Sequence, residues 1–226
     1  MRLYHGTCAR HLDRILEHGL EPRRRRKGNW KEFPSRPDMV YLTNAYAPYF
    51  AISAAKNNMA LILEVEPDPA NLYPDEDFIS QVLAFQSERP LEVVHREVVR
   101  NLEGYRQHSA ESLEGLGNAS HRGSIPSSRI SRYCLLDSKL RPELAMFALD
   151  PSISIMNYRF CGSRYRSIIS WLFGDRQDFE LMMGGNEAYF ELLSRNQPDI
   201  RSRTEKLFRN RAGIQVCTNR AYSGAA

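Results

Sequence analysis

Several features that assign a chain to a class at once are absent from this sequence. No apolar run among the 226 residues approaches the roughly 18 residues that a membrane-spanning helix needs. The opening MRLYH lacks the apolar segment of a secretory signal, so we expect a cytoplasmic protein with no membrane partner. Gly and Pro, at 13 and 12 residues, are too few for a collagen-like or low-complexity chain.

Cysteine is scarce and widely spaced. The four residues, Cys8, Cys134, Cys161 and Cys217, form no C-x-x-C pair, which argues against a zinc ribbon or a thioredoxin-type site. Free thiols in a reducing compartment agree with a cytoplasmic location. We therefore expect no bound metal.

Charge of one sign is not in large excess either. The 31 Lys and Arg residues oppose 27 Asp and Glu, and the formal charge of +4 permits a polyanionic partner without requiring one. The distribution is uneven, because cations gather in Arg23–Lys27 and beyond Arg159, whereas acids gather between Glu64 and Asp77. Hydrophobic residues make up 42% of the chain, which excludes global disorder.

The hydrophobic pattern predicts alternating strands and helices. We expect short strands over residues 2–5, 39–43, 60–66, 118–122, 132–137 and 145–149. The first helix is expected between Thr7, as its N-cap, and Gly19, as its end. Further helices are expected over residues 45–57, 78–85, 90–111, 163–173 and 186–195. This order indicates a mixed α and β fold.

Polar and aromatic residues gather where two of these strands end. His5 precedes Gly6-Thr7, where glycine admits a ligand close to the backbone and a helix N-terminus favours anions. Tyr41 is followed by Tyr46 and Tyr49, and neighbouring tyrosines can stack on both sides of a flat ring. This set suits a nucleotide with a planar base. The alternative is that His5 is a hydrogen-bonded core residue and the tyrosines are ordinary packing.

Short motifs that follow one another along the chain carry a resemblance to a known family. Leu3-Tyr4-His5-Gly6-Thr7, Ile15-Leu16, Gly19-Leu20 and Val40-Tyr41-Leu42-Thr43 resemble the opening of the ADP-ribosyltransferase fold, and Gly123–Ile130 resembles a segment after its late catalytic strand. The similarity is to the branch marked by His, Tyr and Glu on three strands. That branch includes poly-ADP-ribose polymerases and RNA 2′-phosphotransferases, and DNA-modifying ADP-ribosyltransferase toxins are also similar.

The resemblance covers about residues 2–137 and implies an architecture. It implies an α+β fold with a split, mostly antiparallel sheet and flanking helices. Residues 1–141 would form the NAD-binding core, and residues 142–226 would form a helical, basic and aromatic extension packed on it.

The resemblance also implies NAD as the bound molecule, with no further cofactor. His5 would hold the nicotinamide-side ribose, the Gly6 backbone would grip the nicotinamide amide, and Thr7 would contact the ribose. Tyr41 would stack on the nicotinamide ring. The opposite face of that ring would be closed by one of two residues, Tyr46 or Tyr49.

The glutamate of the family is missing from its expected strand, residues 118–122. Glu114, which we prefer, or Glu111 could enter the site from upstream. His121 or Arg122 could occupy the position instead, and an arginine would suit a phosphate-bearing substrate. Loss of catalysis is the third possibility.

Three charged or aromatic segments allow more than one interpretation. Arg23–Lys27 is a solvated loop, or it holds phosphates, with Arg23 as the candidate contact to NAD. Asp75–Asp77 suits a helix start through the macrodipole and needs no function. Asn157–Trp171 interleaves basic and aromatic residues, a mixture that suits binding of single-stranded nucleic acid. The spacing of its apolar residues also predicts a helix packed in the core.

We therefore expect transfer of ADP-ribose from NAD to a macromolecular target with release of nicotinamide, and we favour nucleic acid over protein. A toxin or phage conflict protein would fit the resemblance. One alternative is removal of a 2′-phosphate from RNA with NAD. Another is a catalytically silent module that binds NAD or nucleic acid.

Overall fold

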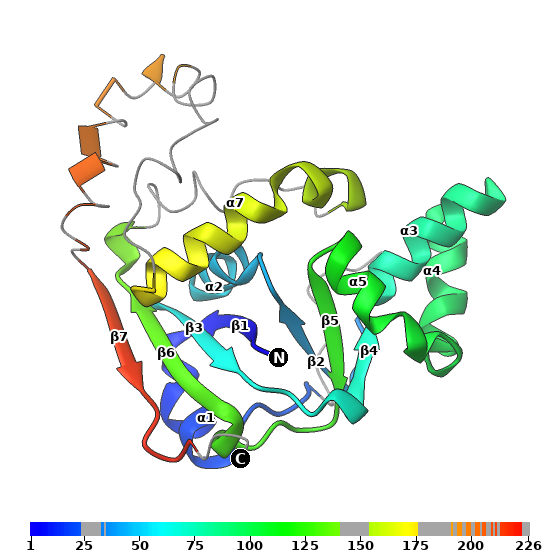
Figure 1. Cartoon of the computed structure of the whole chain (residues 1–226), viewed down its shortest axis with the longest axis horizontal. Coiled ribbons are helices and arrows are strands. Elements are labelled where there is room, and N and C mark those ends of the chain that lie inside the picture. Colours follow the sequence, from blue (N-terminus) through cyan, green and yellow to red (C-terminus); the bar gives the residue numbers. More distant parts are fainter. Residues whose placement is uncertain are drawn as a thin grey trace.

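One seven-stranded sheet forms the centre of the computed structural model (Figure 1). The structure describes residues 1–23, 33, 35–140, 154–175 and 213–222, with single positions between 191 and 211. The strands are β1 Leu3–Cys8, β2 Met39–Thr43, β3 Ala60–Val65, β4 Leu72–Pro74, β5 Asn118–Arg122, β6 Ile130–Leu136 and β7 Ile214–Thr218. Their order across the sheet is β4-β5-β2-β1-β3-β6-β7, and all six neighbouring pairs are antiparallel.

The sheet is split between β1 and β2. β1 pairs with β3 along its whole length, from Leu3 with Val65 to Cys8 with Ala60. With β2 it shares a single registered pair, Tyr4 with Thr43. Two half-sheets, β4-β5-β2 and β1-β3-β6-β7, therefore meet at one point, as expected for a split, mostly antiparallel sheet in an α+β fold.

Helices cover both faces of this sheet. The α-helices are α1 Leu12–His18, α2 Ala47–Ala55, α3 Glu76–Ser87, α4 Leu91–Arg100, α5 Ser109–Gly115 and α7 Ile155–Phe173. The short 3-10 helices are η1 Ala9–His11, η2 Pro69–Asn71, η3 Leu102–His108, η4 Ser127–Arg129 and η5 Ser138–Leu140. None of the helices in the described ranges has the length and apolar character required to cross a membrane.

Side chains alternate between the two faces, so each face has its own core. On one face, α1 packs on both half-sheets through residues such as Ile15, Leu42 and Leu63. On the other face, α2 and α7 cover the β1-β3-β6 side, whereas α3 and α4 cover the β2-β5-β4 side. The split in the sheet therefore lies between two separately packed groups of helices.

The first helix begins later than predicted. β1 continues through Thr7, which is buried and pairs with Leu61, because a β-branched residue fits a complete six-residue ladder with β3. The turn η1 follows, and His11 is the N-cap of α1 without a side-chain hydrogen bond. The expected capping role of Thr7 is therefore wrong. Gly19 does end α1, with φ of 82° and its N–H bonded to the Ile15 carbonyl.

The chain beyond residue 141 contributes to the sheet as well as to the helices. The helix predicted over residues 163–173 is confirmed and starts earlier, at Ile155. β7, which the hydrophobic pattern did not predict, pairs with β6 from Leu136–Ile214 to Arg132–Thr218. The strand predicted over residues 145–149 and most of the helix predicted over residues 186–195 lie outside the described residues. The division at residue 141 stays a prediction.

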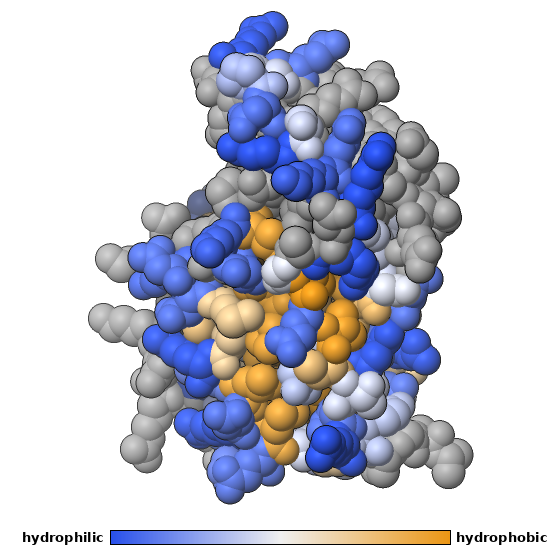
Figure 2. All heavy atoms as spheres, turned by 90° about the vertical axis from the view of Figure 1, so that its left-hand side faces the viewer, coloured by the Kyte–Doolittle hydropathy of each residue, from blue (hydrophilic) through white to orange (hydrophobic). Residues whose placement is uncertain are grey.

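Two smaller features complete the fold. Cys8 and Cys134 are buried free thiols, and Cys217 is free and half-buried. The side of the molecule that carries β7 shows an apolar area bordered by charged residues (Figure 2). Half-buried apolar side chains on this edge of the sheet include Leu135 and Val216.

Candidate functional site

His5 and Tyr41 meet at the split in the sheet. His5 Nδ1 lies 2.9 Å from the backbone carbonyl oxygen of Tyr41, so the imidazole of β1 bridges to β2. A carbonyl only accepts, so Nδ1 carries the hydrogen and Nε2 of a neutral ring is an acceptor. Burial lowers the pKa of His5, the hydrogen bond to Tyr41 opposes this, and the positive charge of Arg23 adds to the lowering. His5 is therefore a neutral imidazole at pH 7.

The Tyr41 side chain lies on the opposite face, between β2 and the α3–α4 pair. Its hydroxyl accepts a hydrogen bond of 2.7 Å from the Arg36 N–H and donates one to Glu76 Oε1. Burial, followed by the nearby carboxyl of Glu76, raises the pKa of Tyr41 above its ordinary value. The phenol therefore keeps its proton and works as a hydrogen-bonding aromatic ring.

Glu76 is the acid that the structure brings to Tyr41. It begins α3 and is 2% exposed. Oε1 accepts from the Tyr41 hydroxyl and, at 3.3 Å, from the Arg36 N–H, while the buried Oε2 has no hydrogen-bond partner among the described residues. Burial raises the pKa of Glu76 to about 7. Its carboxyl thus changes charge near neutral pH.

The helix-start interpretation of the acidic run is only partly confirmed. Asp75 is the N-cap of α3, with a side-chain oxygen 2.9 Å from the Asp77 backbone nitrogen. Glu76 is different because it lies on the inner face of the helix with Ile79 and Ser80, at i+3 and i+4. An acid on an apolar helical face is the sequence signal that could have identified it.

Arg36 fixes the backbone that covers Tyr41, and no sequence motif pointed to it. Its guanidinium makes two hydrogen bonds to Asp38, of 2.9 and 2.8 Å, and one of 2.9 Å to the Val99 carbonyl on α4. These contacts hold the Arg36 N–H above the Tyr41 hydroxyl and Glu76. The loop before β2, α3 and α4 thereby all fix this tyrosine.

Of the other predicted contacts to NAD, two have packing roles. Thr7 is buried within β1, and Tyr46 is 2% exposed, with its ring 5.0 Å from that of Tyr165 under α7. Tyr49 is half-buried, and its ring centroid lies 5.6 Å from that of Phe50.

The close approach at Gly6 is made by the protein itself. A Cβ atom at Gly6 would lie 2.2 Å from the Ala47 carbonyl oxygen, so α2 packs directly on the β1 backbone. Arg23 is exposed, and its charge acts on His5. The structure thus brings Arg23 to His5 and places a helix, rather than open surface, against this side of Gly6.

The four candidates for the third position lie elsewhere. Glu114 is exposed on α5, and Glu111 is exposed and bonded at 2.7 Å to His108. His121 is buried, with Nδ1 3.3 Å from the Gly123 carbonyl oxygen. Within the described ranges, no hydrogen bond or ion pair joins either glutamate or His121 to His5 or Tyr41.

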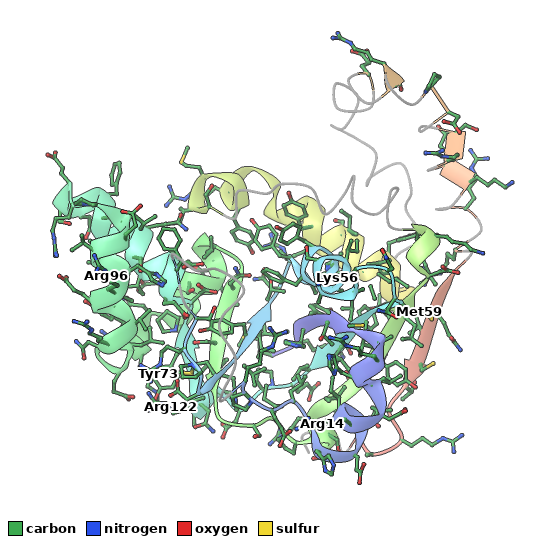
Figure 3. The ribbon with its side chains drawn as sticks, turned by 180° about the vertical axis from the view of Figure 1, so that it is seen from behind. Arg14, Lys56, Met59, Tyr73, Arg96 and Arg122 are labelled. Atoms are coloured by element: carbon green, nitrogen blue, oxygen red, sulfur yellow. The ribbon has the colours of Figure 1, made fainter. Side chains whose placement is uncertain are left out.

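Arg122, the fourth candidate, is already paired. Its guanidinium lies 2.6 Å from Glu103 and 4.3 Å above the centre of the Tyr73 ring. Figure 3 shows Arg122 and Tyr73 side by side. At the other end of β5, the first residue is Asn118, which is buried and lies opposite Thr43. The side-chain amide oxygen of Asn118, Oδ1, lacks a hydrogen-bond partner within the described ranges. β5 therefore begins with an amide and contains no acid, although the resemblance implied one on this strand.

No protein-family model and no curated protein matches the sequence. Among solved structures, the nicked CARDS toxin is 11% identical with a TM-score of 0.36, over 60% of this chain and 25% of that chain. EcPltA is 9% identical with a TM-score of 0.36, over 60% of this chain and 75% of that chain. A mutant of E. coli heat-labile enterotoxin is 16% identical with a TM-score of 0.34, over 75% and 85% of the two chains. At these TM-scores the likenesses carry no conclusion about chemistry. This chain spans a quarter of the CARDS toxin.

Proposed function

We propose that this chain is an NAD-dependent ADP-ribosyltransferase that transfers ADP-ribose to a macromolecular target and releases nicotinamide. The observation that supports this proposal is a chain of hydrogen bonds that links three residues at the split in the sheet. The His5 imidazole bridges to the Tyr41 backbone, and the Tyr41 hydroxyl is held by the buried carboxyl of Glu76. A histidine, a tyrosine and a glutamate are thus connected, although the acid does not come from β5.

The residues offer the chemistry that this reaction needs. Transfer breaks the bond between ribose and nicotinamide, and electron-rich or anionic groups stabilise the positive charge that develops on the ribose. His5, with Nδ1–H used by the Tyr41 carbonyl, presents Nε2 as an acceptor for a ribose hydroxyl. Tyr41 offers an aromatic face for stacking, and the exposed Arg23 offers a cation for the pyrophosphate.

The 2′-phosphotransferase alternative depends on a cation at Arg122. In the structure this guanidinium is neutralised by Glu103 and stacked on Tyr73, and Asp38 lies 3.9 Å from its Nε. A phosphate would have to displace Glu103 to reach the guanidinium in the same way. We therefore prefer ADP-ribose transfer to phosphate removal.

The choice of target is left to experiment. Tyr158, Tyr165 and Trp171 are buried, so the prediction of a core helix in this segment is confirmed and these rings provide no stacking surface for bases. The preference for nucleic acid therefore loses its aromatic support. Protein and nucleic acid are both retained as acceptors.

The test is transfer of label from NAD in a cell lysate. The protein is incubated with NAD labelled in the adenylate part, and the product is treated with nuclease or with protease. We expect transfer to a macromolecule, release of nicotinamide, and loss of both in His5→Ala. His18→Ala, which removes an exposed histidine from α1, is the matched control and should label like the wild type. Wild-type labelling by His5→Ala would refute the site, and no nicotinamide release by the wild type would favour the silent module.

A further inference from the structure

The acid missing from β5 has a counterpart at the start of α3. Resting on the proposed function, we infer that Glu76 is a positioning residue that orients the Tyr41 hydroxyl and places a negative charge beside it. Glu76 touches Tyr41 and Arg36, and it is too deeply buried to meet a substrate directly. Its influence on the reaction would therefore pass through the tyrosine.

The buried environment of Glu76 is unfavourable for a residue with a purely structural role. The side chain is 2% exposed, and Oε2 has no hydrogen-bond partner in the described part of the chain. A buried carboxyl oxygen without a partner costs free energy, and an apolar side chain beside Ile79 would avoid that cost. Asp75 already caps α3, so the helix does not need a second acid at this position.

The hydrogen bonds at Tyr41 depend on the charge of Glu76. An ionised carboxylate can only accept, so it fixes the Tyr41 hydroxyl as its donor and leaves the phenol oxygen to the Arg36 N–H. A protonated carboxyl also carries an O–H, which competes with Arg36 for that oxygen. The two protonation states therefore give Tyr41 two different arrangements.

The groups around Glu76 place this change near neutrality. Facing it are Tyr41 from β2, Arg36 from the preceding loop, and Asp75 and Asp77 from α3 itself, while His95 of α4 lies 3.5 Å from Asp77. Burial dominates and raises the pKa of Glu76 to about 7. Because the anionic form supports a developing positive charge at the tyrosine face, we expect activity to rise as Glu76 ionises.

The first experiment is the pH profile of nicotinamide release between pH 5.5 and pH 8.5. Wild type should rise up to about tenfold per pH unit below a midpoint near 7. Glu76→Gln, which preserves shape and hydrogen bonding but cannot ionise, should be at least about tenfold slower at pH 8 and lack this limb, with little change in KM for NAD. Glu92→Gln, an exposed acid in the first turn of α4, should follow the wild type. A Glu76→Gln profile parallel to the wild type would overturn the inference while leaving the proposed function intact.

The second experiment needs no NAD. Tyrosines labelled with 13C at Cζ are followed by NMR from pH 5 to pH 9, and Tyr41→Phe identifies the Tyr41 signal. We expect that signal to titrate with a midpoint near 7 in wild type and in Glu92→Gln, and to stay constant in Glu76→Gln. A signal that does not titrate, or that titrates below pH 5, overturns the inference whatever the activity. Titration near 7 in a wild type that releases no nicotinamide would instead refute the proposed function.

Discussion

Among the described residues, each half of the molecule buries one glutamate, and the two differ in how their oxygens are satisfied. Glu64 on β3 is 1% exposed, and Arg132 and Ser131 together bond both of its oxygens. Glu76 on α3 is 2% exposed, but among the described residues only its Oε1 has hydrogen-bond partners. Glu64 is thus a completed ion pair that joins β3 to β6.

Of these two buried acids, Glu76 is the one to connect with function. Arg132 also binds Asp175 at the end of α7, and the hydrogen bonds to Asp175 and Glu64 raise the pKa of Arg132. That network ties α7 to the sheet and leaves no oxygen of Glu64 unused. In the described part of the chain no cationic side chain bonds to the Glu76 carboxyl, and the neighbours of Glu76 include two further acids. Burial alone does not distinguish the two glutamates. What distinguishes Glu76 is a carboxyl oxygen that has no hydrogen-bond partner among the described residues, in a side chain that bonds a tyrosine.

The largest effect should come from breaking the completed pair. Arg132→Ala would leave Glu64 buried without its cation, and such a loss costs about 3–5 kcal/mol of unfolding free energy. Urea unfolding at pH 7 measures it. Arg2→Ala removes an exposed arginine that lies 3.9 Å from Glu66, and it should change stability by less than about 1 kcal/mol. A similarly small loss in Arg132→Ala would show that Glu64 does not need its ion pair.

Glu76→Gln should have the opposite sign and depend on pH. The carboxyl has an ordinary pKa of 4.5 when unfolded and about 7 when folded, so between these values the folded chain binds more protons than the unfolded chain. Stability contributed by the protonated group is therefore lost as pH rises through this window. The difference corresponds to about 3 kcal/mol once the group is fully ionised.

Chemical unfolding at pH 4 and pH 8 tests this sign. Glu76→Gln should match the wild type at pH 4 and be more stable by up to about 3 kcal/mol at pH 8. Glu92→Gln should match the wild type at both values, because that side chain is exposed. Equal destabilisation of Glu76→Gln at both values would mean that Glu76 stabilises the fold as Glu64 does. A variant that is more stable yet slower would be the expected trade between stability and function.

These two glutamates also mark what the sequence can predict. The spacing of apolar residues was sufficient for β2, β3, α3 and α7, because their periods are local. The motifs around His5 and Tyr41 led to the point where the two half-sheets meet. An acid on an apolar helical face can draw attention to Glu76, but its contact with Arg36, 40 residues away along the chain, is not contained in any local pattern.

Two further differences between the expectations from the sequence and the structure also have physical causes. Thr7 satisfies the rules for a helix cap, but the long ladder between β1 and β3 includes it as a strand residue. Tyr46 matched the spacing of an aromatic clamp, yet α7 covers it with Tyr158 and Tyr165 from more than a hundred residues later. In both cases tertiary packing decides between alternatives that local sequence leaves equal.

The smallest effect tests the link between Glu76 and Tyr41 themselves. Tyr41→Phe removes the hydroxyl that Glu76 Oε1 and the Arg36 N–H share, and losing such a partner costs about 1–2 kcal/mol when the group left behind is buried. The loss should be larger at pH 8 than at pH 4, because an unpaired carboxylate is costlier to bury than a neutral carboxyl.

A double-mutant cycle with Glu76→Gln separates the pair from its surroundings. If the two side chains act together, their effects on unfolding free energy at pH 8 should differ from additivity by about 0.5 kcal/mol or more. Tyr73→Phe with Glu76→Gln is the control cycle, because the Tyr73 hydroxyl bonds Glu103 rather than Glu76. Additivity in the Tyr41 cycle would mean that the hydrogen bond does not couple them. Coupling that vanishes at pH 4 would instead tie the interaction to the ionised carboxylate of Glu76.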